Sequence, residues 1–77
     1  MDLANLVNMA NRIAEFHAVW PDPDAAALAI AEHIRKFWAP RMRRELLQNL
    51  ESPSTAELHP LACQALKLHR DELMPFN

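Results

Sequence analysis

Apolar residues recur along most of the chain at the spacing of three and four residues that places side chains on one face of an α-helix. No stretch alternates apolar and polar residues convincingly at the two-residue period of a β-strand. The pattern predicts four helices, over residues 3–19, 23–38, 40–51 and 60–73. We therefore expect an all-α fold, in which residues 1–77 form a single small bundle of three to four short helices.

Short polar residues and prolines mark the expected starts of these helices. Asp2 and Asp22 stand where N-caps belong, because a carboxylate there can accept hydrogen bonds from the first free N–H groups of a helix. Pro40 and Pro60 fit the first helical position, where the missing N–H of proline costs nothing. His59 directly precedes Pro60, and we expect it to be a helix start rather than a catalytic base.

Two further segments interrupt the helical pattern. Trp20 precedes a proline, which disfavours the α-conformation for Trp20, so the first helix should close there. Residues 51–57 are rich in serine, proline and threonine and predict a linker. Between these breaks, the positions well inside each apolar stripe are expected to form the core at the helix contacts: Ile13, Ile34, Phe37, Leu46 and Leu66.

The composition is that of a small domain that needs a partner. A chain of 77 residues has a small core, and such domains usually add disulfides, a metal or association with another chain. The single cysteine, Cys63, excludes an internal disulfide, and the absence of glycine excludes glycine-rich phosphate-binding loops. Association with a partner is therefore the expected source of stability. The isolated chain could also pair with itself through the broad apolar face of the first helix.

Positive charge is concentrated in one short segment. Five of the eight lysine and arginine residues lie within residues 35–44, which contain no acidic residue, although the formal net charge of the chain is −2. The segment also holds two aromatic residues and a proline, and Trp, Met and Arg are enriched in the centres of protein interfaces. We predict that it docks on a partner protein through Arg35, Phe37, Trp38, Arg41, Met42, Arg43 and Arg44.

Arg43 differs from the other basic residues of this segment. The helical repeat places it beside Leu47 and Leu50, on the apolar side of its helix. An unpaired buried charge costs several kcal/mol, so the guanidinium group must reach a carboxylate of this chain, extend past Leu47 to water, or meet an acidic or carbonyl group of a partner.

The sequence offers no constellation for catalysis or metal binding. None of the four histidines forms the i, i+4 pair of a helical zinc site, and no cysteine-pair spacing is present. His17 and His69 fall on apolar faces, where a hydrogen-bonded structural histidine is the ordinary interpretation. Cys63 has only Lys67 nearby to lower its pKa, so a structural thiol is expected. We expect no catalytic, cofactor-binding or metal-binding residue.

Other features bear on location and on nucleic acid. The N-terminal residues have neither the basic start nor the apolar core of a signal peptide, and no apolar run approaches the roughly 20 residues of a membrane span. With a lone thiol, a cytoplasmic location without membrane association is expected. A sequence pI near 6.0 argues against general nucleic-acid binding, although the basic segment leaves a small helical nucleic-acid-binding domain as a weaker alternative.

Two stretches carry a resemblance to a known family. Residues 6–13 read Leu-Val-Asn-Met-Ala-Asn-Arg-Ile, and residues 33–44 read His-Ile-Arg-Lys-Phe-Trp-Ala-Pro-Arg-Met-Arg-Arg. Together with the short helix expected after Pro60, they resemble the delta-subunit family of NAD-dependent formate dehydrogenases, over nearly the whole chain from Leu3 to Arg70.

The resemblance implies a non-catalytic small subunit of a soluble complex that oxidises formate with NAD. It implies that a catalytic large subunit carries a molybdenum or tungsten cofactor and that other subunits carry iron–sulfur clusters and flavin. The small subunit of the family is associated with assembly or stability of the complex. An alternative within this interpretation is an assembly chaperone that binds the immature large subunit and then leaves.

Overall fold

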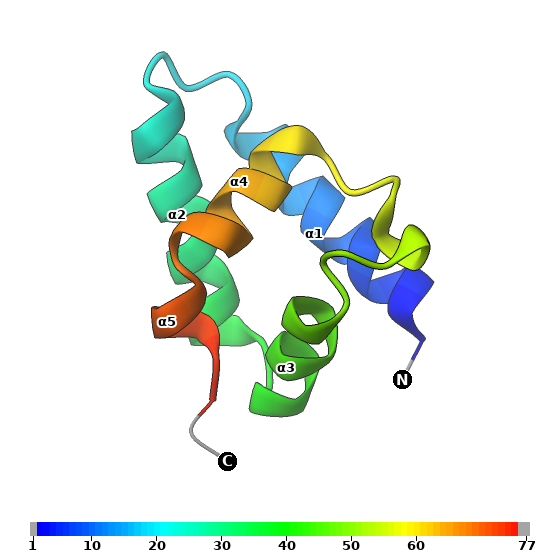
Figure 1. Cartoon of the computed structure of the whole chain (residues 1–77). Helices are drawn as coiled ribbons and strands as arrows, with labels where there is room; N and C mark the ends of the chain where they lie inside the picture. Colours follow the sequence, from blue (N-terminus) through cyan, green and yellow to red (C-terminus); the bar gives the residue numbers. More distant parts are fainter. Residues whose placement is uncertain (1, 76–77) are drawn as a thin grey trace.

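The computed structural model describes residues 2–75, and these form an all-α fold, as predicted (Figure 1). No strand occurs among the described residues. The elements in chain order are α1 (Leu3–His17), α2 (Pro23–Phe37), α3 (Pro40–Gln48), the 3-10 turn η1 (Pro53–Thr55), α4 (Pro60–Leu68) and α5 (Arg70–Leu73).

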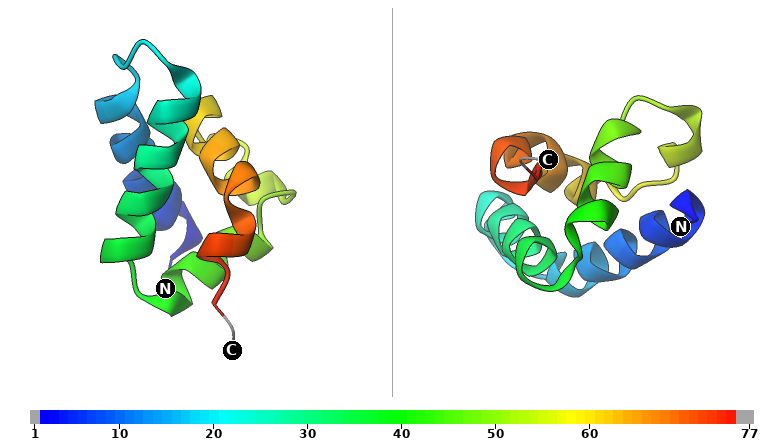
Figure 2. Two further views of the ribbon diagram at one scale, coloured as in Figure 1. Left: turned by 90° about the vertical axis from the view of Figure 1, so that its left-hand side faces the viewer. Right: turned by 90° about the horizontal axis from the view of Figure 1, so that it is seen from below.

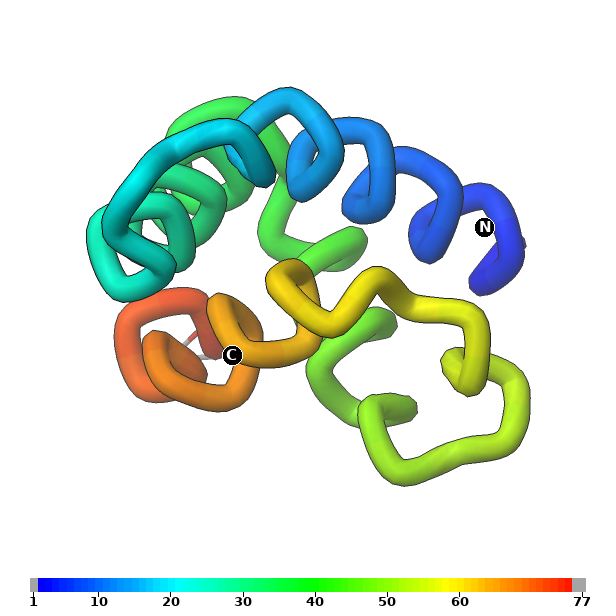
Figure 3. Tube along the Cα trace, turned by 90° about the horizontal axis from the view of Figure 1, so that it is seen from above, coloured from blue at the N-terminus to red at the C-terminus, as the bar shows by residue number. Residues whose placement is uncertain are grey.

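The helices form two layers. α1 and α2 are joined by a short turn into a hairpin that makes one curved layer (Figure 2). α3, η1, α4 and α5 lie on the concave side of this hairpin, and the same arrangement is seen from above (Figure 3). α4 packs mainly on α2, whereas η1 packs on α1. The convex side of the hairpin is left without a covering element from residues 2–75.

The expected helix starts are confirmed by their capping hydrogen bonds. The Asp2 carboxylate accepts from the backbone N–H of Ala4 at 3.1 Å, and the Asp22 carboxylate accepts from that of Asp24 at 3.0 Å. The ring nitrogen Nδ1 of His59 accepts from the N–H of Leu61 at 3.0 Å. Each cap satisfies a donor that would otherwise have no partner, so these short polar residues fix where each helix begins.

Two helices end earlier than expected. α1 closes at His17 and not near residue 19, because the chain leaves the helix in a turn in which the N–H of Trp20 donates to the carbonyl of His17 at 3.1 Å. α3 closes at Gln48 and not at residue 51. There the side-chain amide of Asn49 donates to the carbonyl of Glu45 at 2.7 Å and satisfies one of the free carbonyls of the helix end.

The segment 51–57, predicted as a linker, contains a defined turn. The hydroxyl group of Thr55 is buried in η1 and lies 2.8 Å from the carbonyl oxygen of Asn49. The Asn11 side chain connects α1 to the chain beyond the turn, donating to the carbonyl of Glu57 at 2.9 Å and accepting from the N–H of His59 at 2.6 Å. These polar contacts hold the segment against α1.

The last expected helix, 60–73, is divided into α4 and α5 at His69. His69 has φ −109° and ψ 26°, which are not helical values, although its N–H still donates to the carbonyl of Ala65 at 3.0 Å. Leu73 on α5 is buried in the core. It lies seven residues after Leu66, which places both on the same side of a helix, so its burial agrees with the apolar pattern of the sequence.

The core confirms three of the five expected positions. Ile34, Leu46 and Leu66 are buried, and small residues surround them on α1, α2 and α4, namely Ala10, Ala14, Ala27, Ala31, Ala62 and Ala65. These alanines let the helix backbones approach closely. Ile13 is only half-buried at the edge of the core. The prediction for Phe37 is wrong: it is the last residue of α2 and its side chain extends into solvent.

Candidate partner-binding surface

Residues 35–44, which we call the basic elbow, connect α2 to α3. The N–H of Trp38 closes α2 by donating to the carbonyl of Ile34 at 2.9 Å. Trp38 and Ala39 then have extended backbones, with ψ values of 141° and 149°, and Pro40 begins α3. Proline restricts the preceding residue to such extended conformations, so the sequence itself produces the sharp change of direction.

The two aromatic residues of the basic elbow point in opposite directions. The Trp38 side chain is 6% exposed and belongs to the core, whereas Phe37 is 73% exposed. The ring of Phe37 lies against His33, with 4.8 Å between ring centroids. The placement of Trp38 in the docking surface is therefore corrected, because the extended backbone after α2 turns its indole inward. Phe37 is available to a partner.

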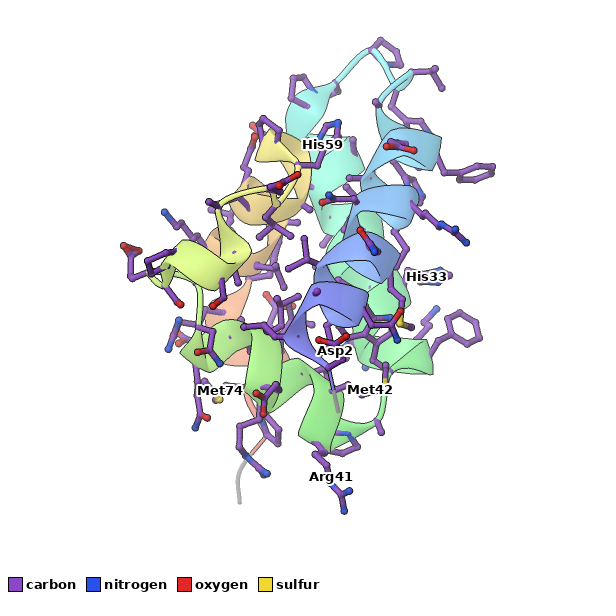
Figure 4. All side chains as sticks on the ribbon, turned by 90° about the vertical axis from the view of Figure 1, so that its right-hand side faces the viewer. Asp2, His33, Arg41, Met42, His59 and Met74 are labelled. Atoms are coloured by element: carbon purple, nitrogen blue, oxygen red, sulfur yellow. The ribbon has the colours of Figure 1, made fainter. Side chains whose placement is uncertain are left out.

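The basic side chains of the elbow have no carboxylate within ion-pair distance among residues 2–75. Arg35, Lys36 and Arg41 are exposed, and Arg41 extends away from the body of the molecule (Figure 4). Ion pairs in the described part of the chain join Lys67 to Glu51 at 3.7 Å and His69 to Glu72 at 3.2 Å. The basic side chains of the elbow therefore form no ion pair within residues 2–75.

Three of these arginines line one surface hollow of about 500 Å³, which we call the arginine hollow. Arg35 comes from the end of α2, and Arg43 and Arg44 come from α3. The remaining lining residues are Pro40, Glu72, Met74 and Pro75. Guanidinium groups bind carboxylates with paired, charge-assisted hydrogen bonds, so the hollow is suited to an acidic group.

Arg43 is the most constrained of the three. Its Nε atom is buried and has no hydrogen-bond partner among the described residues. The burial of Nε confirms that this part of the Arg43 side chain lies on the inner side of α3, as predicted. No carboxylate in residues 2–75 forms an ion pair with the side chain. Buried donors are nearly always satisfied in native proteins, so this N–H is expected to take an acceptor from outside residues 2–75, which water or a partner can supply.

A second surface lies on the broad apolar face of the first helix, which was predicted, but the groove on it was not. Phe16 is 77% exposed on α1, and a groove of about 320 Å³ opens beside it, lined by Arg12, Ile13, Phe16, His17 and His33. We call it the α1–α2 groove. The sequence indicated this surface by the position of Phe16, which lies beyond the edge of the apolar stripe of its helix. The apolar surface of the helix is therefore wider than one packing partner covers.

His17 is held in place within this groove. Its Nδ1 atom lies 2.9 Å from the carbonyl oxygen of Ile13, one turn earlier on α1. Its ring lies between those of Phe16 and Trp20, with centroid distances of 5.3 Å and 5.2 Å. The hydrogen-bonded structural role expected for His17 agrees with this geometry.

The described residues hold no group of three or more His, Cys, Asp or Glu side chains placed to bind a metal ion. Cys63 is half-buried and unpaired. Within residues 2–75 no helix combines the length and apolar character that a membrane crossing requires.

Comparison with known proteins identifies the family. The sequence model of the NADH-dependant formate dehydrogenase delta subunit FdsD matches residues 5–66. The chain belongs to this family. Neither the curated proteins nor the solved structures gave a match. The matched range of the FdsD family includes the whole basic elbow and every residue of the α1–α2 groove.

Proposed function

We propose that this FdsD-family chain is a non-catalytic subunit that assembles with and stabilises an NAD-dependent formate dehydrogenase complex. The observation that carries the proposal is the basic elbow, where three arginines share one hollow and the buried Nε of Arg43 lacks an acceptor. Arginines that form no ion pair within residues 2–75, beside an exposed phenylalanine, are the residue types of an interface centre.

The proposed partner is the catalytic large subunit, bound through an acidic group that enters the arginine hollow. The molybdenum or tungsten cofactor, the iron–sulfur clusters and the flavin are assigned to the partner subunits. Iron–sulfur clusters take several cysteine thiolates as ligands, and this chain has one cysteine. The cytoplasmic location expected from composition stays a prediction.

The test is purification of the complex from cells that express a tagged form of this chain together with the other subunits. A stabilising subunit stays in fixed ratio with the mature enzyme that reduces NAD with formate. Recovery of the chain only with cofactor-free large subunit would instead establish the assembly chaperone. If the chain is recovered with neither form, the proposed function is wrong.

The non-catalytic assignment has a separate test. The isolated chain is expected to give formate-dependent NAD reduction no faster than a buffer blank, because no nucleophile–base pair was found in the sequence and no metal-ligand group lies within the described residues. Activity clearly above the blank would contradict the assignment.

A further inference from the structure

The convex side of the α1–α2 hairpin carries large apolar side chains that the fold does not use. Phe16 on α1 is 77% exposed and Phe37 at the end of α2 is 73% exposed. The His33 ring, which lies against Phe37, also lines the α1–α2 groove, and Figure 4 shows it pointing outward from α2. Exposed apolar surface that surrounds a groove marks interaction sites in soluble proteins.

We infer that the α1–α2 groove and its two phenylalanines form a second docking site, which receives an apolar segment of the catalytic subunit flanked by an acidic residue. The inference rests on the proposed function for the identity of the partner. It adds a surface whose lining shares no residue with the arginine hollow and includes two apolar side chains.

The charges around the groove decide the chemistry of the occupant. Arg12 and two histidines line the groove, and no carboxylate does. Phe16 and the half-buried side chain of Ile13 form the apolar part of the lining. A partner segment with an apolar side chain that contacts Ile13 and a neighbouring carboxylate that faces Arg12 would match both the apolar and the charged part of the lining.

The same charges argue against a second copy of this chain as the occupant. In a two-fold dimer each surface patch meets its own equivalent. Pairing through the groove would bring Arg12 of one copy against a lining that contains the same arginine and no carboxylate, so its charge would have no partner there. A partner with acidic flanks has no such conflict.

Phe37 makes the two docking sites continuous. It is the last residue of α2, it packs on His33 of the groove, and it lies within the basic elbow. A partner that places an acidic group in the arginine hollow can therefore contact Phe37 and continue into the groove. The matched family range contains Arg12, Phe16, His33 and Phe37 as well as the arginines of the elbow.

The experiment measures the dissociation constant of the purified chain for the formate dehydrogenase complex that lacks it. Phe16→Ala and Phe37→Ala should each weaken binding about 10- to 100-fold, the loss expected when a phenylalanine is no longer buried. Leu68→Ala is the matched control, because Leu68 is 60% exposed but lies on α4, outside the groove. Arg12→Glu should weaken binding more than Arg12→Lys.

The outcomes separate this inference from the proposed function. If Phe16→Ala binds as tightly as Leu68→Ala while Phe37→Ala and Arg43→Lys bind weakly, the groove is not a docking site but the elbow is. If the wild-type chain does not bind the complex, both proposals are wrong. Sedimentation of the free chain tests the remaining occupant: a wild-type dimer that becomes monomeric in Phe16→Ala would assign the groove to a second copy and overturn the inference.

Discussion

The inner and outer sides of the α1–α2 hairpin differ in what their apolar residues do. On the inner side, Ile30 and Ile34 are fully buried together with alanines, and the neighbouring helices approach closely. On the outer side, Phe16 and Phe37 remain about three-quarters exposed. One hairpin thus has one apolar surface that the fold covers and another that it leaves open.

This difference separates the residues that hold the domain together from those that are available to a partner. The inner side uses small and aliphatic residues, which pack without voids when the backbones are near. The outer side uses large rings bordered by cations, a combination typical of interface centres. Substitutions on the inner side should therefore lower stability, and substitutions on the outer side should lower affinity.

The sharpest contrast lies between two adjacent residues. Trp38→Ala should lower the free energy of unfolding by about 3–5 kcal/mol, because it removes a buried ring and leaves a cavity. Phe37→Ala should change it by no more than about 0.5 kcal/mol, as for other surface positions. Urea denaturation of the two variants measures both values. Equal losses in the free energy of unfolding would contradict the assignment of Trp38 to the core and Phe37 to the surface.

A second substitution tests the inner side at its centre. Ile34→Ala should cost about 2–5 kcal/mol through lost burial and cavity formation. Because small domains are only marginally stable, this variant is expected to melt at a much lower temperature or to remain unfolded alone. Leu28→Ala on the same helix is the control, since the side chain of Leu28 lies outside the core and is 44% exposed. An unchanged melting temperature for Ile34→Ala would contradict the assigned core.

The turn that joins the two helices offers a smaller effect. Asp22→Ala removes the carboxylate that accepts from the N–H of Asp24, and should cost about 1 kcal/mol. Asp22→Asn keeps an acceptor at the N-cap and should restore most of that loss. Thermal denaturation of both variants checks the prediction. A larger loss in Asp22→Asn than in Asp22→Ala would show that the cap is not what Asp22 contributes.

Local signals in the sequence were sufficient for the helix starts and for much of the core. A side chain with a hydrogen-bond acceptor just before a helix can bind the free N–H groups of the first turn. Asp2, Asp22 and His59 could therefore be assigned as N-caps from the sequence. Ile34 lies at the centre of its stripe, and any neighbour on that side covers it. The inner placement of Arg43 followed from the same helical repeat.

The errors arose where a residue's environment depends on another element. Phe37 shares the stripe of Ile34, but it is the last residue of α2, and no described element covers it. The break between α4 and α5 at His69 was not predicted, because no glycine or proline lies within residues 61–74 to signal it. The α1–α2 groove requires the relative position of two helices, and the periodicity of each helix alone does not give that position.

The central claim is that the basic elbow binds a partner while the inner side of the hairpin maintains the fold. Its most direct test is Arg43→Lys, measured both for yield of the co-purified formate dehydrogenase complex and for melting of the free chain. Lysine keeps the charge but cannot reproduce the paired hydrogen bonds of a guanidinium group. Arg41→Ala is the control, because Arg41 is exposed at the rim of the elbow. Removal of its charge should change the association rate and the dependence of binding on salt concentration. The expected result for Arg43→Lys is a clear fall in complex yield with an unchanged melting temperature. An unchanged yield with a lowered melting temperature would contradict it, because Arg43 would then act within the fold.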